Sequence, residues 1–572
     1  QADGSHLGIG VNSLHAQTVG TTGRALGLFL GAAGLLLLLA AMNAATLLLA
    51  RSLDRTQELG VRMALGAGRG RVVRLLVSEA GILSVVGGAF GVLLAYGGVG
   101  VFLHYAPSSI PRLSTVAVDA RVLAVAAVVS LGTGIAAGLL PALRLTRRGP
   151  WERLQTAGRA FVEPSSRLRG VLVGGQMAVA VVLLSGAGLL FGSFVRMTTA
   201  DPGFEADGVI TMNVEAKGGS RWNFQAHWVS WDVLLDEVRA VPGVESVAAT
   251  SIYPLQSPRW APRLLLPGDT PETVREGIAR YAITPGYHET MGTRLLLGRD
   301  IERMDGPDAE RVALVNESFV RTQLGGGDPI DVIVGWSAGD EWSVGDEWRP
   351  PAEWLAGEAT PLRIVGVVED VVQMRVGEGP RAAIYVPYTQ SRPVSPSIVV
   401  RTTRAPEVIM PELHRAAVRF NPRIPPVDLD TMEDRMSATR TTPRFQAMLI
   451  GAFALVAMLL AAAGLYGSLA HSVSRRQREL GVRMALGADR AGVLRMVLGQ
   501  GMRLSVAGLA VGMIAALLST RVLSGFLYGV EPNDPVTMLM VGAVLVLVSA
   551  VACLAPARRA TAVDPVTVLK AE

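Results

Sequence analysis

The stretch Glu58-Leu59-Gly60-Val61-Arg62-Met63-Ala64-Leu65-Gly66-Ala67 occurs a second time, letter for letter, from Glu479 to Ala488. Ten identical positions in a row do not arise by chance at any appreciable rate, so the chain contains an internal duplication. A long apolar run precedes each copy, and another follows it. The two copies therefore indicate that one membrane arrangement occurs twice along the chain.

Each copy has the pattern of a short amphipathic helix, in which side chains three or four positions apart share one side. A glycine, Gly66 or Gly487, is expected to end the helix. Such a helix fits a membrane surface between two spanning helices. A solvated helix without a partner is the alternative, but the repetition of both faces favours a docking element that is used twice. The charged faces hold Arg55, Glu58, Arg62, Arg476, Glu479 and Arg483, and the apolar faces hold Leu59, Met63, Leu480 and Met484.

The composition indicates a membrane protein with a sizeable polar domain. Half of the 572 residues are hydrophobic, and the mean hydropathy of +0.38 is rare among soluble proteins. The net charge of +5 does not indicate a nucleic-acid partner, because the basic residues lie in segments beside apolar runs. The only cysteine, Cys553, allows no intrachain disulfide, so the polar domain must be held together by its own core.

Seven apolar runs are long enough to cross a bilayer, which requires about 20 residues each. They lie at 26–50, 80–103, 122–143, 170–195, 447–470, 502–526 and 537–557. Arginines gather in alternate connecting segments: there are six in 51–74, seven in 144–169 and six in 473–499. The segment 526–536, by contrast, has none. Because basic connecting segments stay in the cytoplasm, we expect the three arginine-rich segments and the C-terminus there, and segment 196–444 outside.

Two polar residues interrupt the spans. No Asp or Glu lies in the middle of a span, which argues against a proton- or sodium-coupled transporter. Two amide side chains do lie within the spans, Asn43 and Gln176. We expect an interhelical hydrogen bond for each rather than a transport site.

The outer segment 196–444 has the pattern of a globular α+β domain. Alternating or apolar runs predict strands, other stretches predict helices, and Asp201-Pro202-Gly203-Phe204 predicts a turn directly after the membrane. The stretch 325–361, rich in Gly, Pro, Trp and acids, is expected to form loops. The predicted strands are 209–214, 244–250, 311–316, 362–368, 382–386 and 397–401, and the predicted helices are 231–241 and 406–420.

The duplication extends beyond the repeated helix. Leu140-Pro141-Ala142 is followed by Pro150, and Ala555-Pro556-Ala557 is followed at the same distance by Pro565. Each half therefore ends a span with Pro-Ala, crosses a basic turn and closes with a Pro-led amphipathic turn. Since the first half has three spans and the second has four, we expect one span and an outer domain before Gln1.

The chain lacks the motifs of covalent chemistry. Gly66-Ala67-Gly68-Arg69-Gly70 is glycine-rich, but it lacks the Gly-Lys-Ser/Thr ending of a Walker A loop. The seven histidines have no metal-ligand spacing, and His288 with Glu289 is interpreted as the start of a surface helix. We expect no catalytic residue, no metal and no cofactor, so a membrane-bound enzyme is a weak hypothesis.

At the repeated ten-residue stretch the chain resembles the FtsX/MacB-like permeases of ATP-binding cassette systems. The order of elements is also similar: a span, a large outer domain that begins with Asp201 to Phe204, then three spans with the amphipathic stretch between the first two. The second half fits this pattern from about Arg167 to Glu572, and the first half from about Gly23 to Leu154. Two such halves in one chain resemble the duplicated permeases of Acidobacteria. The motif does not indicate a substrate.

The resemblance implies an α-helical multi-pass membrane protein with seven spans in a tandem repeat and an α+β extracytoplasmic domain of the MacB periplasmic-core type. It implies an extracytoplasmic remnant at 1–25, a first FtsX-like permease domain at 26–157, and a linker with the fourth span at 158–196. The MacB-like periplasmic core domain would occupy 197–444, and a second FtsX-like permease domain 445–572.

The same resemblance implies a role as the non-catalytic permease subunit of an export or mechanotransmission system in the bacterial inner membrane. A separate ATPase, expected as a dimer, would dock on the repeated helices, and a periplasmic adaptor or other envelope protein would meet the outer domain. The alternative is a non-transporting signal transmitter that activates or senses through its outer domain. The expected ATPase-coupling residues are Arg55, Glu58, Leu59, Gly60, Arg62, Met63, Arg476, Glu479, Leu480, Gly481, Arg483 and Met484.

Overall fold

The structure is a computed structural model, and its chain forms two compact units. The helical unit comprises Gln1–Val195 and Thr442–Glu572, and the outer unit comprises Arg196–Thr441. The residues that the structure describes are 14–55, 58, 61–62, 65, 67–105, 116–146, 164–214, 231–256, 263–266, 278–337, 360–373, 379–391, 397–420, 426–486 and 489–561.

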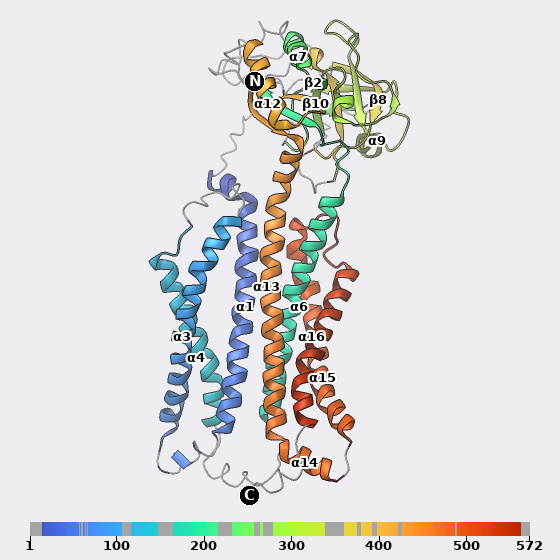
Figure 1. The fold of residues 1–572 in the computed structure, drawn as a ribbon. Coiled ribbons are helices and arrows are strands. Elements are labelled where there is room, and N and C mark those ends of the chain that lie inside the picture. The colour runs from blue at the N-terminus through green and yellow to red at the C-terminus, as the bar shows by residue number, and fades with distance from the viewer. Residues whose placement is uncertain are drawn as a thin grey trace, which may run out of the picture. The chain divides into compact units, whose positions relative to one another are not determined.

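The helical unit is built from long apolar helices that run side by side (Figure 1). Among the described residues, seven helices are long and apolar enough to cross a membrane, which confirms the number of spans predicted from the sequence. The short 3₁₀ helix Thr520–Phe526 continues the sixth of them. The seven are α1 (Leu14–Asp54), α3 (Arg69–Tyr105), α4 (Ala120–Thr146), α6 (Pro164–Thr199), α13 (Met432–Arg475), α15 (Arg490–Ser519) and α16 (Pro535–Thr561).

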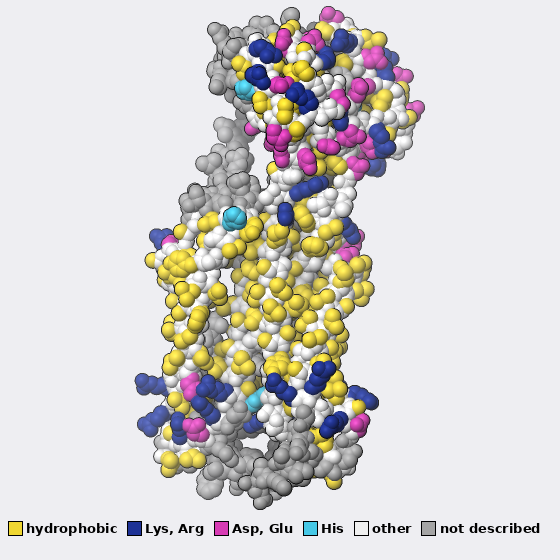
Figure 2. All heavy atoms as spheres, viewed as in Figure 1, with side chains coloured by type: hydrophobic (Ala, Val, Ile, Leu, Met, Phe, Trp, Pro, Cys, Tyr) yellow, Lys and Arg dark blue, Asp and Glu magenta, His cyan; other side chains and the backbone are white. Residues whose placement is uncertain are grey.

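Large apolar side chains lie on the outer surface of these helices as well as at the contacts between them. Leu30, Phe90, Leu94 and Leu539 are all more than 60% exposed. A helix that is apolar on every side suits a lipid environment rather than water. Figure 2 shows hydrophobic side chains over this unit, and shows arginines gathered at its end near α14 (Gln477–Ala485).

The two repeats preserve the same helix contact. Ala80 and Gly501 each lie 22 residues after the glutamate of the repeated stretch, and Gly138 and Cys553 each lie three residues before the repeated proline. A Cβ atom added to Gly138 would lie 2.6 Å from Ala80 Cβ, and one added to Gly501 would lie 2.5 Å from Cys553 Sγ. In each repeat, a glycine thus allows two helices to approach closely, α3 with α4 and α15 with α16.

The outer unit contains a mixed eleven-stranded sheet with the order β11-β1-β10-β2-β4-β9-β6-β8-β7-β3, and β5 also pairs with β8. The pairs β4–β9 and β6–β8 are parallel. The strands are β1 (Val209–Val214), β2 (Val244–Thr250), β3 (Arg263–Leu265), β4 (Ala279–Ile283), β5 (Leu295–Gly298), β6 (Val312–Asn316), β7 (Ile333–Ser337), β8 (Thr360–Val368), β9 (Ala383–Pro387), β10 (Ser397–Thr402) and β11 (Pro426–Thr431).

Alternate residues of the strands enter two separate cores, as the period of a strand requires. Ile210 of β1 belongs to a core that includes Leu234 of α7 (Trp231–Arg239) and Ile409 of α12 (Pro406–Phe420). Val209 belongs to a second core with Tyr253 and other residues. The remaining helices in the described part of this unit are α8 (Tyr287–Met291), α9 (Glu317–Gln323) and α11 (Tyr388–Ser391).

Most of the predicted elements of the outer unit are confirmed, and one prediction is wrong. The turn at Asp201 is present: the Gly203 amide donates to Asp201 Oδ1 at 2.9 Å, and Gly203 has a φ of 76°. The prediction that 325–361 forms only loops is wrong, because β7 (Ile333–Ser337) lies there and pairs with β8 and β3.

Candidate functional site

The second copy of the repeated stretch forms α14 (Gln477–Ala485), directly after α13. Leu480 is 2% exposed and belongs to an apolar cluster with Val473 of α13, Val493 of α15 and Ala557 of α16, against which Met484 packs. Gly481 is also buried. The apolar face of α14 is therefore seated against three long helices.

The charged face of α14 points away from this cluster and pairs within itself. Arg483 Nη2 lies 2.6 Å from Glu479 Oε1, four positions earlier, and Arg476 Nε lies 4.0 Å from Glu479 Oε2. All three side chains are about half exposed. Such pairs on a helix surface stabilise the helix by only about 0.3–0.5 kcal/mol each, so their charges remain available to a partner.

The first copy repeats this geometry where the structure describes it. Glu58 and Arg62 are helical, and Arg62 Nη2 lies 2.6 Å from Glu58 Oε1, as in the second copy. Arg55 differs from its counterpart, since its Nη1 donates to Glu79 of α3 at 2.8 Å. The predicted coupling residues Leu59, Gly60 and Met63, and the helix-ending Gly66 and Gly487, lie outside the described residues.

Sequence reasoning missed an exposed apolar side chain at the end of each copy. Leu65 and Leu486 are each 83% exposed, and Val61 and Val482, one turn earlier, are 53% and 40% exposed. The signal lay in the repeated stretch itself, where Val and Leu recur four positions apart beside the charged pair. Each copy therefore presents exposed Val and Leu side chains next to an ion pair.

The exposed charges and apolar side chains of each copy can bind a partner. Within the described ranges, no group of three or more His, Cys, Asp or Glu side chains could hold a metal ion. The exposed pair and the leucine beside it are chemically suited to a contact with another protein, in which apolar area supplies affinity and charges supply orientation.

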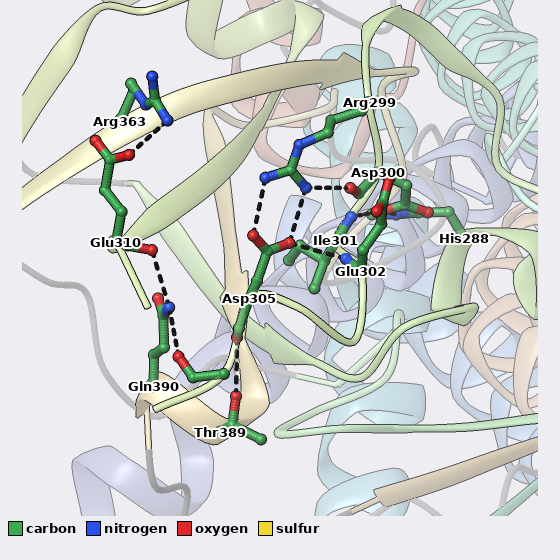
Figure 3. Close-up of polar contacts among 11 residues, drawn as sticks. His288, Arg299, Asp300, Ile301, Glu302, Asp305, Glu310, Arg363, Thr389 and Gln390 are labelled. Atoms are coloured by element: carbon green, nitrogen blue, oxygen red, sulfur yellow. Dashed lines mark hydrogen bonds and ion pairs between the residues drawn. The ribbon is translucent and has the colours of Figure 1, made fainter. Parts of the chain in front are cut away.

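The outer unit contains an ion pair, between the half-buried Arg299 and the buried Asp305, that holds a loop. In Figure 3, Arg299 reaches Asp305 with both terminal nitrogens, each at 2.8 Å, and the Glu302 amide donates to the same carboxylate. Burial would raise the pKa of the Asp305 carboxyl, but the hydrogen bonds from Arg299 and Glu302 outweigh it and lower that pKa. Thr389 and Gln390 of α11 bond the backbone of the same loop. These contacts fix the connection from β5 to β6 and are structural.

The interpretation of His288 as the start of a surface helix is wrong. Its side chain is 3% exposed, and its Nδ1 lies 3.0 Å from Asp300 Oδ1. The ring also packs edge-on against Tyr385, with centroids 5.0 Å apart. His288 lies at the start of a short helix, but inside the domain.

Asn43 confirms the prediction of an interhelical hydrogen bond, since its Nδ2 donates to the Leu460 carbonyl of α13 at 2.8 Å. Gln176 does not: it is fully buried, and within the described part of the chain neither of its amide atoms has a hydrogen-bond partner.

Two family models match this chain. The model "FtsX-like permease C-terminal" matches residues 30–150 and again residues 451–565. The model "MacB-like periplasmic core domain" matches residues 175–422. The first model thus covers both copies of the repeated helix, and the second covers the strands of the outer unit from β1 to β10.

Known proteins are similar over parts of the chain. Macrolide export ATP-binding/permease protein MacB 2 of Aeromonas hydrophila subsp. hydrophila is 24% identical over 326 residues, which cover 54% of this chain and 47% of that protein. Pyoverdine export ATP-binding/permease protein PvdT of Pseudomonas savastanoi pv. phaseolicola is 37% identical over 142 residues, covering 24% and 20%. A crystal structure of the periplasmic region of MacB from Actinobacillus actinomycetemcomitans covers 42% of this chain and 95% of that one, with 14% identity and a TM-score of 0.28.

The chain spans less than half the length of these curated relatives. The family models nevertheless match its repeated helices and its outer domain in the order that the family resemblance implies. The chain belongs to the FtsX/MacB-like permease family of ATP-binding cassette systems.

Proposed function

We propose that this chain is the non-catalytic permease subunit of an export system, and that a separate ATPase dimer drives it by docking on the two repeated helices. Residues 26–157 and 445–572 would act as two permease domains, with the fourth span at 158–196. Residues 197–444 would form the outer domain that meets cargo, an adaptor or another envelope protein.

One observation carries this proposal: the same helix surface occurs twice at the charged end of the helical unit. In α14, Leu480 seats the helix, while Glu479, Arg483 and Leu486 face outward. A helix held by one face and presenting the other can transmit a push from a bound partner to the spans that it touches. Two such helices suit an ATPase with two equivalent subunits.

The names of similar proteins favour export over signal transmission. MacB 2 of Aeromonas hydrophila and PvdT of Pseudomonas savastanoi are named for the export of macrolides and of pyoverdine. Both names also include ATP binding, and the 572 residues of this chain contain no Walker A pattern. We therefore assign ATP hydrolysis to a partner.

The proposed orientation places the repeated helices and the C-terminus in the cytoplasm, as the arginine distribution indicates. Reporters fused after residue 156 and after residue 486 are expected to give a cytoplasmic signal, and a reporter after residue 330 an external one. The measurement is paired alkaline phosphatase and fluorescent-protein fusions. A cytoplasmic signal at residue 330 would overturn the seven-span arrangement.

The function is tested by reversing the exposed glutamates. The double variant Glu58→Arg/Glu479→Arg is expected to fold at wild-type yield, because each glutamate contributes only a weak surface ion pair. It should lose most of the ATPase that co-purifies with the wild type, since both contacts become repulsive, whereas each single reversal should lose part of it. Co-purification from native membranes, followed by mass spectrometry, measures the loss.

A matched control is Glu531→Arg, which reverses an exposed carboxylate elsewhere in the same unit. This control should retain the ATPase. If the double variant folds and keeps the ATPase at wild-type level, these glutamates are not docking contacts, and the repeated stretch is a surface helix without a partner.

A further inference from the structure

Two residues that hold the same position in the two repeats meet inside the helical unit. Asn43 lies 15 residues before Glu58, and Gly464 lies 15 residues before Glu479, so the two positions are equivalent. A Cβ atom added to Gly464 would lie 2.3 Å from Asn43 Oδ1. Two copies related by a twofold axis bring equivalent residues face to face where the axis passes.

The contact continues along α1 and α13, which lie alongside each other in Figure 1. Asn43 Nδ2 donates to the Leu460 carbonyl at 2.8 Å, one turn before Gly464. A Cβ atom added to Gly467 would lie 3.4 Å from Leu47 Cδ2, so the helices still touch one turn later. The equivalent helices of the two repeats thus touch at two glycines of α13, where no side chain separates them.

Helix α6 packs against α1 and α13 at the same level. A Cβ atom added to Gly175 would lie 3.3 Å from Met42 Sδ, and the Gln176 Oε1 lies 2.2 Å from the Cβ position of Gly464. Leu39 of α1 is fully buried in the apolar core that α6 and α13 share. The first repeat therefore covers the face that α6 and α13 present at this level.

We propose that the two repeats of this one chain form the twofold core of the permease, with α1 in the place that α13 of a second copy would otherwise fill. The axis passes between Asn43 and Gly464, and only one of these two positions carries a side chain. The occupant of this face is the first repeat of the same chain. This inference concerns assembly and depends neither on the cargo nor on the ATPase.

Cysteine pairs test the proposal in native membranes. The variant Asn43→Cys/Gly464→Cys is made in a Cys553→Ala background, with a protease site inserted after residue 156. After mild oxidation and cleavage, most molecules should run as one full-length band without reductant and as two fragments with it. The control Asn43→Cys/Gly451→Cys should give two fragments in both lanes, because Gly451 lies 13 residues, or about 20 Å, earlier along α13.

The single variant Gly464→Cys distinguishes a second copy from the first repeat. If α13 of another chain occupied this face, equivalent cysteines would meet, and oxidation would give a disulfide-linked dimer of twice the mass. We expect no such dimer. A dimer from the single variant, or fragments that separate without reductant in the Asn43/Gly464 pair, would overturn the proposal.

An exchange of the two residues provides a test without cross-linking. Gly464→Asn alone should lower the folded yield several-fold, because the new side chain would collide with both Asn43 and Gln176. Adding Asn43→Gly removes one of the two side chains that crowd this position, so the yield should recover in part, while the Gln176 side chain still has to move aside. If the exchanged protein is no better folded than Gly464→Asn, the two positions do not share an axis.

Discussion

Leu480→Asp is expected to abolish most of the folded protein, whereas Leu486→Asp, six residues later in the same stretch, is expected to leave folding intact. Leu480 is 2% exposed in the cluster that joins α14 to α13, α15 and α16. Truncating a buried leucine to alanine costs about 2–5 kcal/mol, and a buried carboxylate without a partner costs more. Folded yield in detergent, measured by fluorescence-detected size exclusion, reports the loss.

Leu486 is the matched control for folding and also a test of docking. Its side chain is 83% exposed, like that of its counterpart Leu65, so an aspartate there meets water. The pair Leu65→Asp/Leu486→Asp should therefore keep wild-type yield and thermal stability but lose co-purifying ATPase. If Leu480→Asp also folds at wild-type yield, the cluster around α14 does not seat the helix.

Asn316→Ala is expected to unfold the outer domain in most molecules. Asn316 is fully buried at the end of β6, where its Oδ1 accepts from the Phe319 and Ala383 amides, and its Nδ2 donates to Asp370 and the Arg381 carbonyl. Loss of a helix N-cap, here the bond from the Phe319 amide, costs about 0.5–2 kcal/mol, and each further buried polar group left unpaired costs about 1–3 kcal/mol. The combined loss is comparable with the whole stability of a domain, about 5–15 kcal/mol.

Limited proteolysis and thermal unfolding of the full chain measure this effect. Thr322→Ala is the matched control, because Thr322 lies on α9 and donates a hydrogen bond to Ser318, but its side chain is exposed. The control should cost well under 1 kcal/mol. An Asn316→Ala protein as resistant to protease as the control would show that the network around Asp370 is dispensable.

The elements that the sequence predicts well are those whose pattern is local. The spans follow from apolar runs of sufficient length, and all seven are present. Val209–Val214, Val244–Thr250 and Pro406–Phe420 begin and end where predicted, because strand alternation and helical period are strong there. The i, i+4 spacing of Glu479 and Arg483 likewise predicts one charged face, and the two side chains pair on it.

What the sequence could not predict depends on partners far along the chain. The strand β7 is weak on its own and exists because β8 and β3 pair with it. His288 is buried because Asp300 and Tyr385 surround it. The helical period places Leu480 on the apolar face, but the exposure of Leu486 follows from how α14 is seated against α13, α15 and α16.

The unequal pair Asn43 and Gly464 has an evolutionary consequence. In an assembly of two identical chains, residues on the axis must be identical, so one site could not carry an amide while its mate carries none. Gene duplication within a single chain removes that constraint and lets the two copies diverge in complementary directions. Once the space at Gly464 is filled by Asn43, neither half can pair with a copy of itself without a collision or a void. The duplicated arrangement is then retained, because selection acts on the two halves together.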